Sequence, residues 1–125
     1  MFWKSKSKMR ILHIAECAGG VDRYLEMLLP LLADRYEQIF VCSQNYDVHK
    51  YEQLVDRVEQ LVMKQTLLPW TIIRQVRLLR NIIKENHPDI VYCHSSFAGG
   101  LGRLSCIGLS CKVVYNPHGW AFNMN

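Results

Sequence analysis

Short apolar runs alternate with helical segments along the whole chain, and this alternation restricts the fold more than any other feature. The expected strands are residues 9–16, 38–43, 58–64, 90–93 and 112–115. Helical spacing of apolar residues covers 21–36, 70–86 and 97–108, with a short helix near 51–57. Strands that alternate with helices pair in parallel through right-handed crossovers. We therefore predict an α/β fold, a Rossmann-like parallel sheet with helices on both faces.

Pro30 lies inside the first helical segment, so we expect a kink or a broken turn there. The 125 residues suffice for one ordinary domain with a real core.

The net charge of +4 is a property of the N-terminal tail. Lys4, Lys6, Lys8 and Arg10 lie before or at the start of the first strand, and the other basic residues balance the acidic ones. The tail is either solvated or in contact with an anionic membrane surface. Because the rest of the chain is near neutral, we expect no nucleic-acid partner.

No apolar run is long enough to span a bilayer, and residues 11–15 are too short for a signal-peptide core. The number of cysteines is five, and an odd number argues against a disulfide framework. Cys106 and Cys111 lack a second pair of ligands, and no acid-rich cluster is present, so we expect no metal and no cofactor. We expect a cytoplasmic protein.

Three loops follow the first, fourth and fifth expected strands, and they carry the candidate site residues. In a doubly wound sheet these loops open on one edge, where ligands bind in the crevice outside the carboxyl ends of the strands. The loops contain Gly19 and Gly20, then His94, Ser95 and Ser96, then His118 and Gly119.

Gly19 and Gly20 have two interpretations. They make a tight strand-to-helix turn, or they let backbone N–H groups at a helix N-terminus approach a phosphate or a sugar. The dinucleotide pattern G-x-G-x-x-G and its acidic partner are missing, as is the Walker lysine motif, so NAD is a poor candidate.

The two histidines of these loops differ in context. A single histidine after a buried strand, such as His94, is often structural, but the neighbouring Ser95 and Ser96 suit recognition of hydroxyl groups. His118 lies between Pro117 and Gly119, where packing gives little reason for an imidazole. In its neutral form it could hydrogen-bond a substrate or accept a proton. His13, His49 and His87 are interpreted as structural or solvated.

The strongest helical segment, residues 70–86, has a basic flank. Arg74, Arg77, Arg80 and Lys84 gather beside its apolar stripe. Such a flank is usually a solvated face, but together with Trp70 it could contact an anionic membrane.

Four segments in order resemble one family along nearly the whole chain: AGGVDRY (18–24), PDIVYCHSS (88–96), AG through GRL (98–104) and VVYNPHGWAF (113–122). They are similar to the N-terminal domain of glycosyltransferase family 4, in particular enzymes that build bacterial capsular and extracellular polysaccharides. The resemblance implies the N-terminal half of a GT-B enzyme, in which two Rossmann-like domains enclose the active site. The N-terminal half carries most of the acceptor site, and the other half binds the nucleotide-sugar. Members typically retain anomeric configuration and need no metal.

The resemblance also implies roles for individual residues. Gly19, Gly20 and Gly119 would lie against the donor phosphates or the transferred sugar. His118 would be the catalytic residue near that sugar. The acceptor side of the cleft would contain His94, Ser95, Ser96 and Arg103, with Arg103 either structural or cleft-lining. The family often has a histidine at the position of Tyr92, which is a departure.

The chain ends five residues after Trp120. We therefore expect residues 1–125 to be an incomplete acceptor-side domain without the donor-binding domain, and to be inactive alone. The whole enzyme would move a sugar from a nucleotide-sugar to a lipid-linked saccharide in polysaccharide biosynthesis, at the inner face of the cell membrane. Two alternatives stay open. One is a non-catalytic acceptor- or membrane-binding subunit that needs a donor-domain protein in trans. The other is a plain Rossmann-like nucleotide-binding module.

Overall fold

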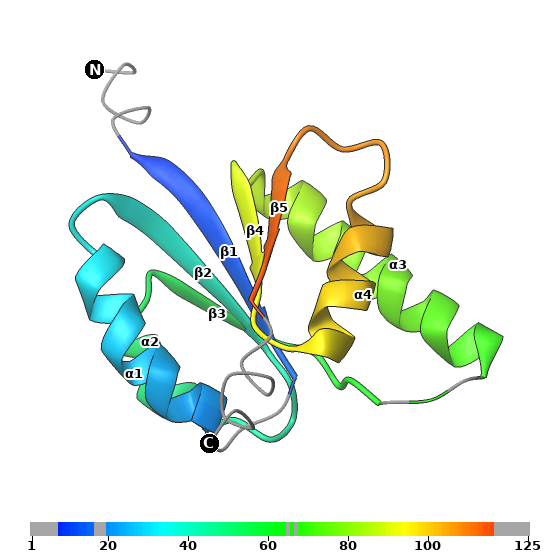
Figure 1. The fold of residues 1–125 in the computed structure, drawn as a ribbon, viewed down its shortest axis with the longest axis horizontal. Coiled ribbons are helices and arrows are strands. Elements are labelled where there is room, and N and C mark those ends of the chain that lie inside the picture. The colour runs from blue at the N-terminus through cyan, green and yellow to red at the C-terminus, as the bar shows by residue number, and fades with distance from the viewer. Residues whose placement is uncertain (1–7, 17–19, 65, 67, 117–125) are drawn as a thin grey trace.

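The computed structural model describes residues 8–16, 20–64, 66 and 68–116. Strands and helices alternate along this part of the chain (Figure 1). The elements are β1 (Met9–Ala15), α1 (Gly20–Leu32), β2 (Tyr36–Cys42), α2 (Val48–Glu52), β3 (Arg57–Gln60), α3 (Pro69–Asn86), β4 (Ile90–Cys93), α4 (Ser96–Ser105) and β5 (Lys112–Tyr115).

The five described strands form one sheet in the order β3-β2-β1-β4-β5, and every pairing among them is parallel. The chain moves outward from β1 to β3 and then returns to the other side of β1 for β4 and β5. The direction of winding thus reverses between β1 and β4, which is the topological switch point of a doubly wound sheet. The predicted α/β fold is confirmed.

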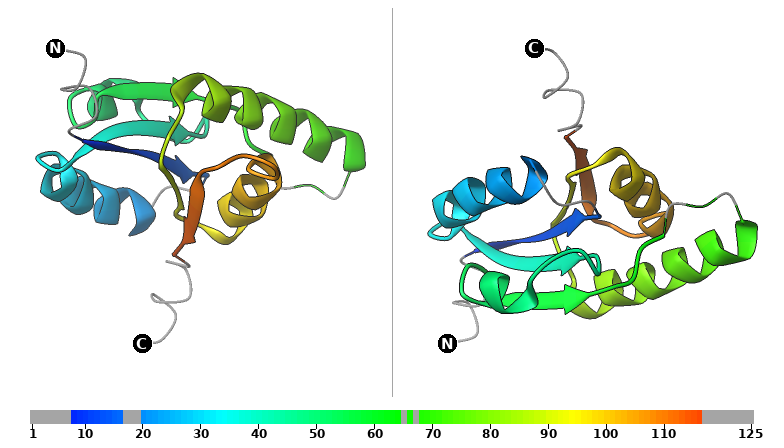
Figure 2. Two further views of the ribbon diagram at one scale, coloured as in Figure 1. Left: turned by 90° about the horizontal axis from the view of Figure 1, so that it is seen from above. Right: turned by 90° about the horizontal axis from the view of Figure 1, so that it is seen from below.

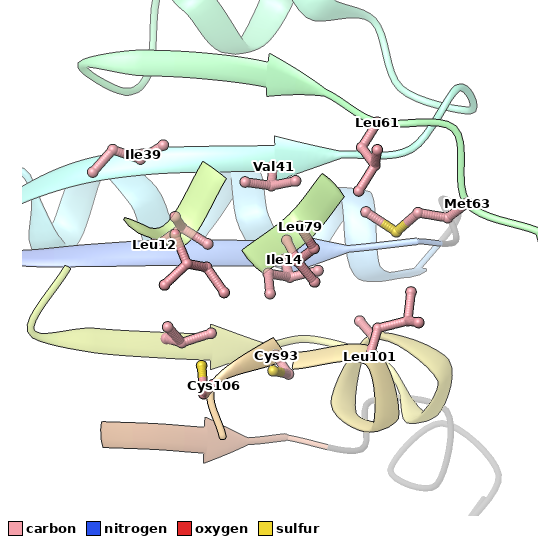
Figure 3. Close-up of a cluster of buried hydrophobic side chains, with 13 residues drawn as sticks. Leu12, Ile14, Ile39, Val41, Leu61, Met63, Leu79, Cys93, Leu101 and Cys106 are labelled. Carbon is pink, nitrogen blue, oxygen red and sulfur yellow. The ribbon is translucent and has the colours of Figure 1, made fainter. Parts of the chain in front are cut away.

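Helices cover both faces of the sheet. Figure 2 shows α1 on one face and α3 on the other, with α4 beside α3. On the face of α3 and α4, alternate residues of the central strands, such as Leu12, Ile14 and Val91, form an apolar cluster (Figure 3). On the face of α1, Leu25 and Leu29 pack against the ring of Phe40. The intervening side chains of β1 and β4 face α1, because side chains alternate along a strand.

Several element boundaries differ from the sequence prediction. Helix α2 starts at Val48 because Asp47 caps it by accepting a hydrogen bond of 3.0 Å from the backbone N–H of His49. The helix predicted at 51–57 was therefore placed too late in the chain. Helix α1 continues through Pro30 and ends soon afterwards at Leu32, so the proline lies in its last turn.

Two glycines of α4 allow this helix to touch the sheet. A Cβ atom on Gly102 would lie 2.5 Å from the sulfur of Cys93, and one on Gly99 would lie 2.7 Å from the ring of Tyr115. Real Cβ atoms do not approach other atoms so closely, so any side chain at these positions would push α4 away from β4 and β5. Gly99 and Gly102, which follow the polar loop at 94–96, thus allow close packing of α4 on the sheet.

Candidate functional site

The structure brings part of the predicted site together at the switch point between β1 and β4. Gly20 is the first residue of α1, and His94 follows β4 directly. Ser95 is the N-cap of α4, and the backbone of Ser96 begins that helix. Gly19, His118 and Gly119 lie outside the described residues, as does the side chain of Ser96.

Ser95 has a structural role that its position explains. Its backbone is extended, with φ −153° and ψ 166°, and its hydroxyl oxygen accepts a hydrogen bond of 3.2 Å from the N–H of Ala98. This satisfies one of the N–H groups that a helix start leaves without a partner. Ser95 therefore fixes where α4 begins at the edge of the crevice.

The ring of His94 is fully buried beneath α1. Its backbone N–H donates to the carbonyl of Ile14 at 2.9 Å, which extends the pairing of β4 with β1 by one residue. The ring stacks on that of Tyr92, with centroids 4.2 Å apart and planes 8° apart. The ring of Tyr24, from α1, lies 6.2 Å away. His94 thus lies beside aromatic rings from two different elements.

A chain of hydrogen bonds runs from His94 into the core. Nε2 of His94 lies 2.9 Å from Nδ1 of His13, and Nε2 of His13 lies 2.9 Å from Oε1 of Gln38. The amide nitrogen of Gln38 then donates to the carbonyl of Leu29 at 2.9 Å. His13, Gln38 and His94 are all buried. Of the two interpretations given for His13, structural or solvated, its burial excludes the solvated one.

Burial lowers the pKa of His13 from 6.5 to about 4, against the opposing effect of its hydrogen bond with Gln38. An imidazolium would lose most of its hydration here, so the neutral ring is favoured. His13 is therefore neutral near pH 7.

Phenol and amide groups adjoin His94 at this edge. Asn116, which follows β5, donates from Nδ2 to the hydroxyl of Tyr92 at 3.4 Å. Burial, and then a hydrogen bond with Tyr92, raises the pKa of Tyr24, so its phenol stays protonated. These neutral groups can both donate and accept hydrogen bonds, which suits ligands that carry hydroxyl groups.

Sequence reasoning missed four of these residues, namely His13, Tyr24, Gln38 and Asn116. One signal was available for His13, because it interrupts an otherwise apolar run in the first strand. In a parallel pair, alternate residues of neighbouring strands share a face. His13 is paired in register with Tyr92, so His13, Tyr92 and His94 lie on one face.

Arg103 lies on the exposed side of α4, with its guanidinium 5.6 Å from the centroid of the Tyr115 ring. This contact on the edge strand favours the structural alternative for Arg103.

Within the described ranges, no three His, Cys, Asp or Glu side chains lie close enough together to hold a metal ion. No helix in the described part of the chain has the length and apolar character needed to cross a membrane.

Solved structures share this fold. A glycosyltransferase from Rickettsia africae superposes with a TM-score of 0.67 and 21% identity over 94% of this chain and 34% of that chain. MurG from Acinetobacter baumannii gives a TM-score of 0.64 and 15% identity over 86% of this chain and 34% of its own. The UDP-GlcNAc 2-epimerase from Methanocaldococcus jannaschii gives a TM-score of 0.64 and 15% identity over 86% of this chain and 31% of its own.

At these identities the likeness shows the fold, which is the Rossmann-like half found in GT-B glycosyltransferases. The chain spans about a third of the length of the solved structures that it matches. Among curated proteins, none matches the sequence at a significant level. A sequence model of Glycosyltransferase Family 4 matches residues 18–124. Because this match covers most of the chain, the chain belongs to glycosyltransferase family 4.

Proposed function

We propose that this chain forms the acceptor side of a glycosyltransferase that moves a sugar from a nucleotide-sugar to a lipid-linked saccharide in polysaccharide biosynthesis. The observation that carries the proposal is the neutral, hydrogen-bonding wall at the switch point of a family 4 domain. Parallel sheets of this kind bind ligands at that point. The phenols of Tyr24 and Tyr92 and the amide of Asn116 can pair with saccharide hydroxyls, which both donate and accept.

The donor side of the proposal rests on the family resemblance. Gly19, Gly20 and Gly119 would approach the donor phosphates or the transferred sugar through their backbones. His118 would act as the catalytic residue beside that sugar. Retention of anomeric configuration without a metal belongs to the same proposal.

The proposal places the donor-binding half in a second GT-B domain, supplied by the same protein or by a partner in trans. This chain aligns with only about a third of each solved structure, which supports an additional half. We expect the 125-residue chain alone to be inactive and to work at the cytoplasmic side of the membrane.

A titration followed by amide NMR tests the acceptor role. A short-chain polyprenyl-diphosphate saccharide should shift the signals of Gly20, His94 and Ser95 at the carboxyl edge. The signals of His87 and Ser110, which line a cavity at the opposite edge, serve as the internal control and should stay in place. Tight binding of NAD or ATP would instead support a plain nucleotide-binding module. Sugar transfer by the chain without any partner would contradict the expected inactivity.

The membrane part of the proposal rests on the outer face of α3. The N-terminal end of this helix projects beyond the sheet (Figures 1 and 2). Trp70 and Ile73 are 68% and 55% exposed, and they line a shallow groove with Arg74 and Arg77. Aromatic and aliphatic side chains beside arginines suit the interface of an anionic bilayer.

The structure separates Arg80 from this surface. Its guanidinium donates to the carbonyls of Ser105 and Ile107, at 3.2 and 2.5 Å, and so ties α3 to the end of α4. Of the basic flank, Arg74 and Arg77 thus adjoin Trp70, whereas Arg80 has a packing role.

Vesicle sedimentation tests the membrane surface. The chain should bind vesicles that contain phosphatidylglycerol more tightly than vesicles of phosphatidylcholine. The double variant Arg74→Gln and Arg77→Gln should weaken binding by roughly thirtyfold, since each of the two basic residues near such a surface contributes about 1 kcal/mol. Arg35→Gln, at an exposed arginine in the turn after α1, is the matched control and should bind normally. Equal losses in both variants would contradict a localised surface.

A further inference from the structure

The hydrogen-bond chain beneath α1 determines which atom of each group carries a proton. The carbonyl of Leu29 can only accept, so the atom of Gln38 that faces it must be the amide nitrogen. The amide oxygen of Gln38 then faces Nε2 of His13 at 2.9 Å. Because that oxygen can only accept, Nε2 of His13 must carry the hydrogen.

The same reasoning continues to His94. His13 is buried and neutral, so with a hydrogen on Nε2 it has a lone pair on Nδ1. Nδ1 of His13 lies 2.9 Å from Nε2 of His94. A lone pair on one side requires a hydrogen on the other, so Nε2 of His94 donates to His13.

We propose that Gln38 and His13 are positioning residues that keep a proton on Nε2 of His94 and so make Nδ1 its acceptor atom. In its neutral form, His94 then accepts hydrogen bonds only through Nδ1. Any proton that it gains is also gained at Nδ1. The ring of Tyr92 stacks on His94 and restricts the orientation of its ring.

This inference rests on the proposed function for one point, that the edge of the sheet at His94 binds the acceptor saccharide.

Nitrogen NMR of isotope-labelled imidazoles in the full chain tests the inference, because protonated and unprotonated ring nitrogens have widely different chemical shifts. In the unaltered chain near neutral pH, Nε2 of His94 should be protonated and Nδ1 should not. Gln38→Leu removes the acceptor that fixes His13, so His13 can switch tautomer and donate to His94. The Nε2 signal of His94 should then move toward the unprotonated position.

Gln75→Leu is the matched control for this variant. Gln75 is also buried, and it makes two hydrogen bonds to the backbone of Lys64, through its amide oxygen and nitrogen. Its loss should also destabilise the fold, because each variant removes two side-chain hydrogen bonds of a buried glutamine, and should leave the proton of His94 on Nε2.

Two substitutions of His13 distinguish a role in fixing the proton of His94 from a role in packing alone. His13→Asn keeps an amide oxygen near the position of Nδ1, so His94 should stay protonated on Nε2. His13→Leu offers no acceptor, so the proton should redistribute between the two nitrogens of His94.

A proton on Nδ1 of His94 in the unaltered chain would overturn the inference, and so would identical His94 signals in the Gln38→Leu and Gln75→Leu variants. If Gln38→Leu does not fold, the unaltered chain and His13→Asn still decide the question. If the tautomer is as expected and the acceptor saccharide does not bind, the proposed function fails and the proton assignment stands.

Discussion

Acidification should destabilise this protein through His13. The pKa of His13 is lowered from 6.5 to about 4, with desolvation by burial as the main cause. Between these two pH values the unfolded chain binds a proton at this residue and the folded chain does not. The free energy of unfolding therefore falls as the pH drops through this window.

The size of the effect follows from the shift in pKa. One unit corresponds to about 1.36 kcal/mol, so the full contribution of His13 is roughly 3 kcal/mol once the pH is below both values. Between about pH 7.5 and about pH 5, the loss should reach roughly 2 kcal/mol. That is a large fraction of the stability of an ordinary small domain, which is about 5–15 kcal/mol.

Urea unfolding at a series of pH values measures this loss. His13→Asn cannot titrate, so its free energy of unfolding should fall by roughly 2 kcal/mol less than that of the unaltered chain over the same range. The titratable groups that face His13, namely His94 and Tyr92, are unchanged in both proteins. His49→Gln, at an exposed histidine of α2, is the control and should keep the pH dependence of the unaltered chain. Equal pH dependence in the unaltered chain and His13→Asn would refute the reasoning.

Two further predictions concern α4, and thermal or urea unfolding measures both. Gly102→Ala should cost about 2 kcal/mol, because its Cβ would lie 2.5 Å from the sulfur of Cys93. Gly100→Ala has nothing within 4 Å of the new Cβ and should instead gain about 0.5–1 kcal/mol, so equal effects would contradict this packing. Ser95→Ala removes the N-cap of α4 and should cost about 1 kcal/mol. Ser110→Ala, at an exposed loop residue, should change stability by less than about 0.5 kcal/mol, and similar losses in both would count against the cap.

The fold could be predicted from the sequence because its signals are local. The predicted bounds of β4 and β5 are confirmed, since each is a short apolar run between polar or proline-containing segments. The predicted start and end of α3 were within one residue of the observed helix. Other bounds were predicted less well. The ends of α1, β3 and α4 were predicted at 36, 64 and 108 and lie at Leu32, Gln60 and Ser105. The start of α2 was also missed, because it depends on a side-chain cap from Asp47 rather than on apolar spacing.

Only part of the site could be predicted, for a physical reason. The loop after β4 is visible in the sequence, because polar residues interrupt an apolar pattern there. The partners of His94 are not visible in the sequence. Gln38 is 25 residues from His13, and His94 is 81 residues from His13. These three side chains meet because β1 lies between β2 and β4. Strand order depends on packing between distant segments, and the local pattern of residue types does not show it.

The two faces of the sheet differ in a way that stability does not explain. The face under α3 and α4 is an apolar cluster around Leu12, Ile14 and Val91. On the other face, the same two strands bury His13 and His94, with Gln38 from β2. A buried hydrogen bond has a small net effect on stability, and apolar side chains of similar shape can be equally stable. Packing alone therefore gives no reason for three linked polar groups at the centre of this face. A histidine with a defined acceptor atom, held at the switch point where such sheets bind ligands, does give one.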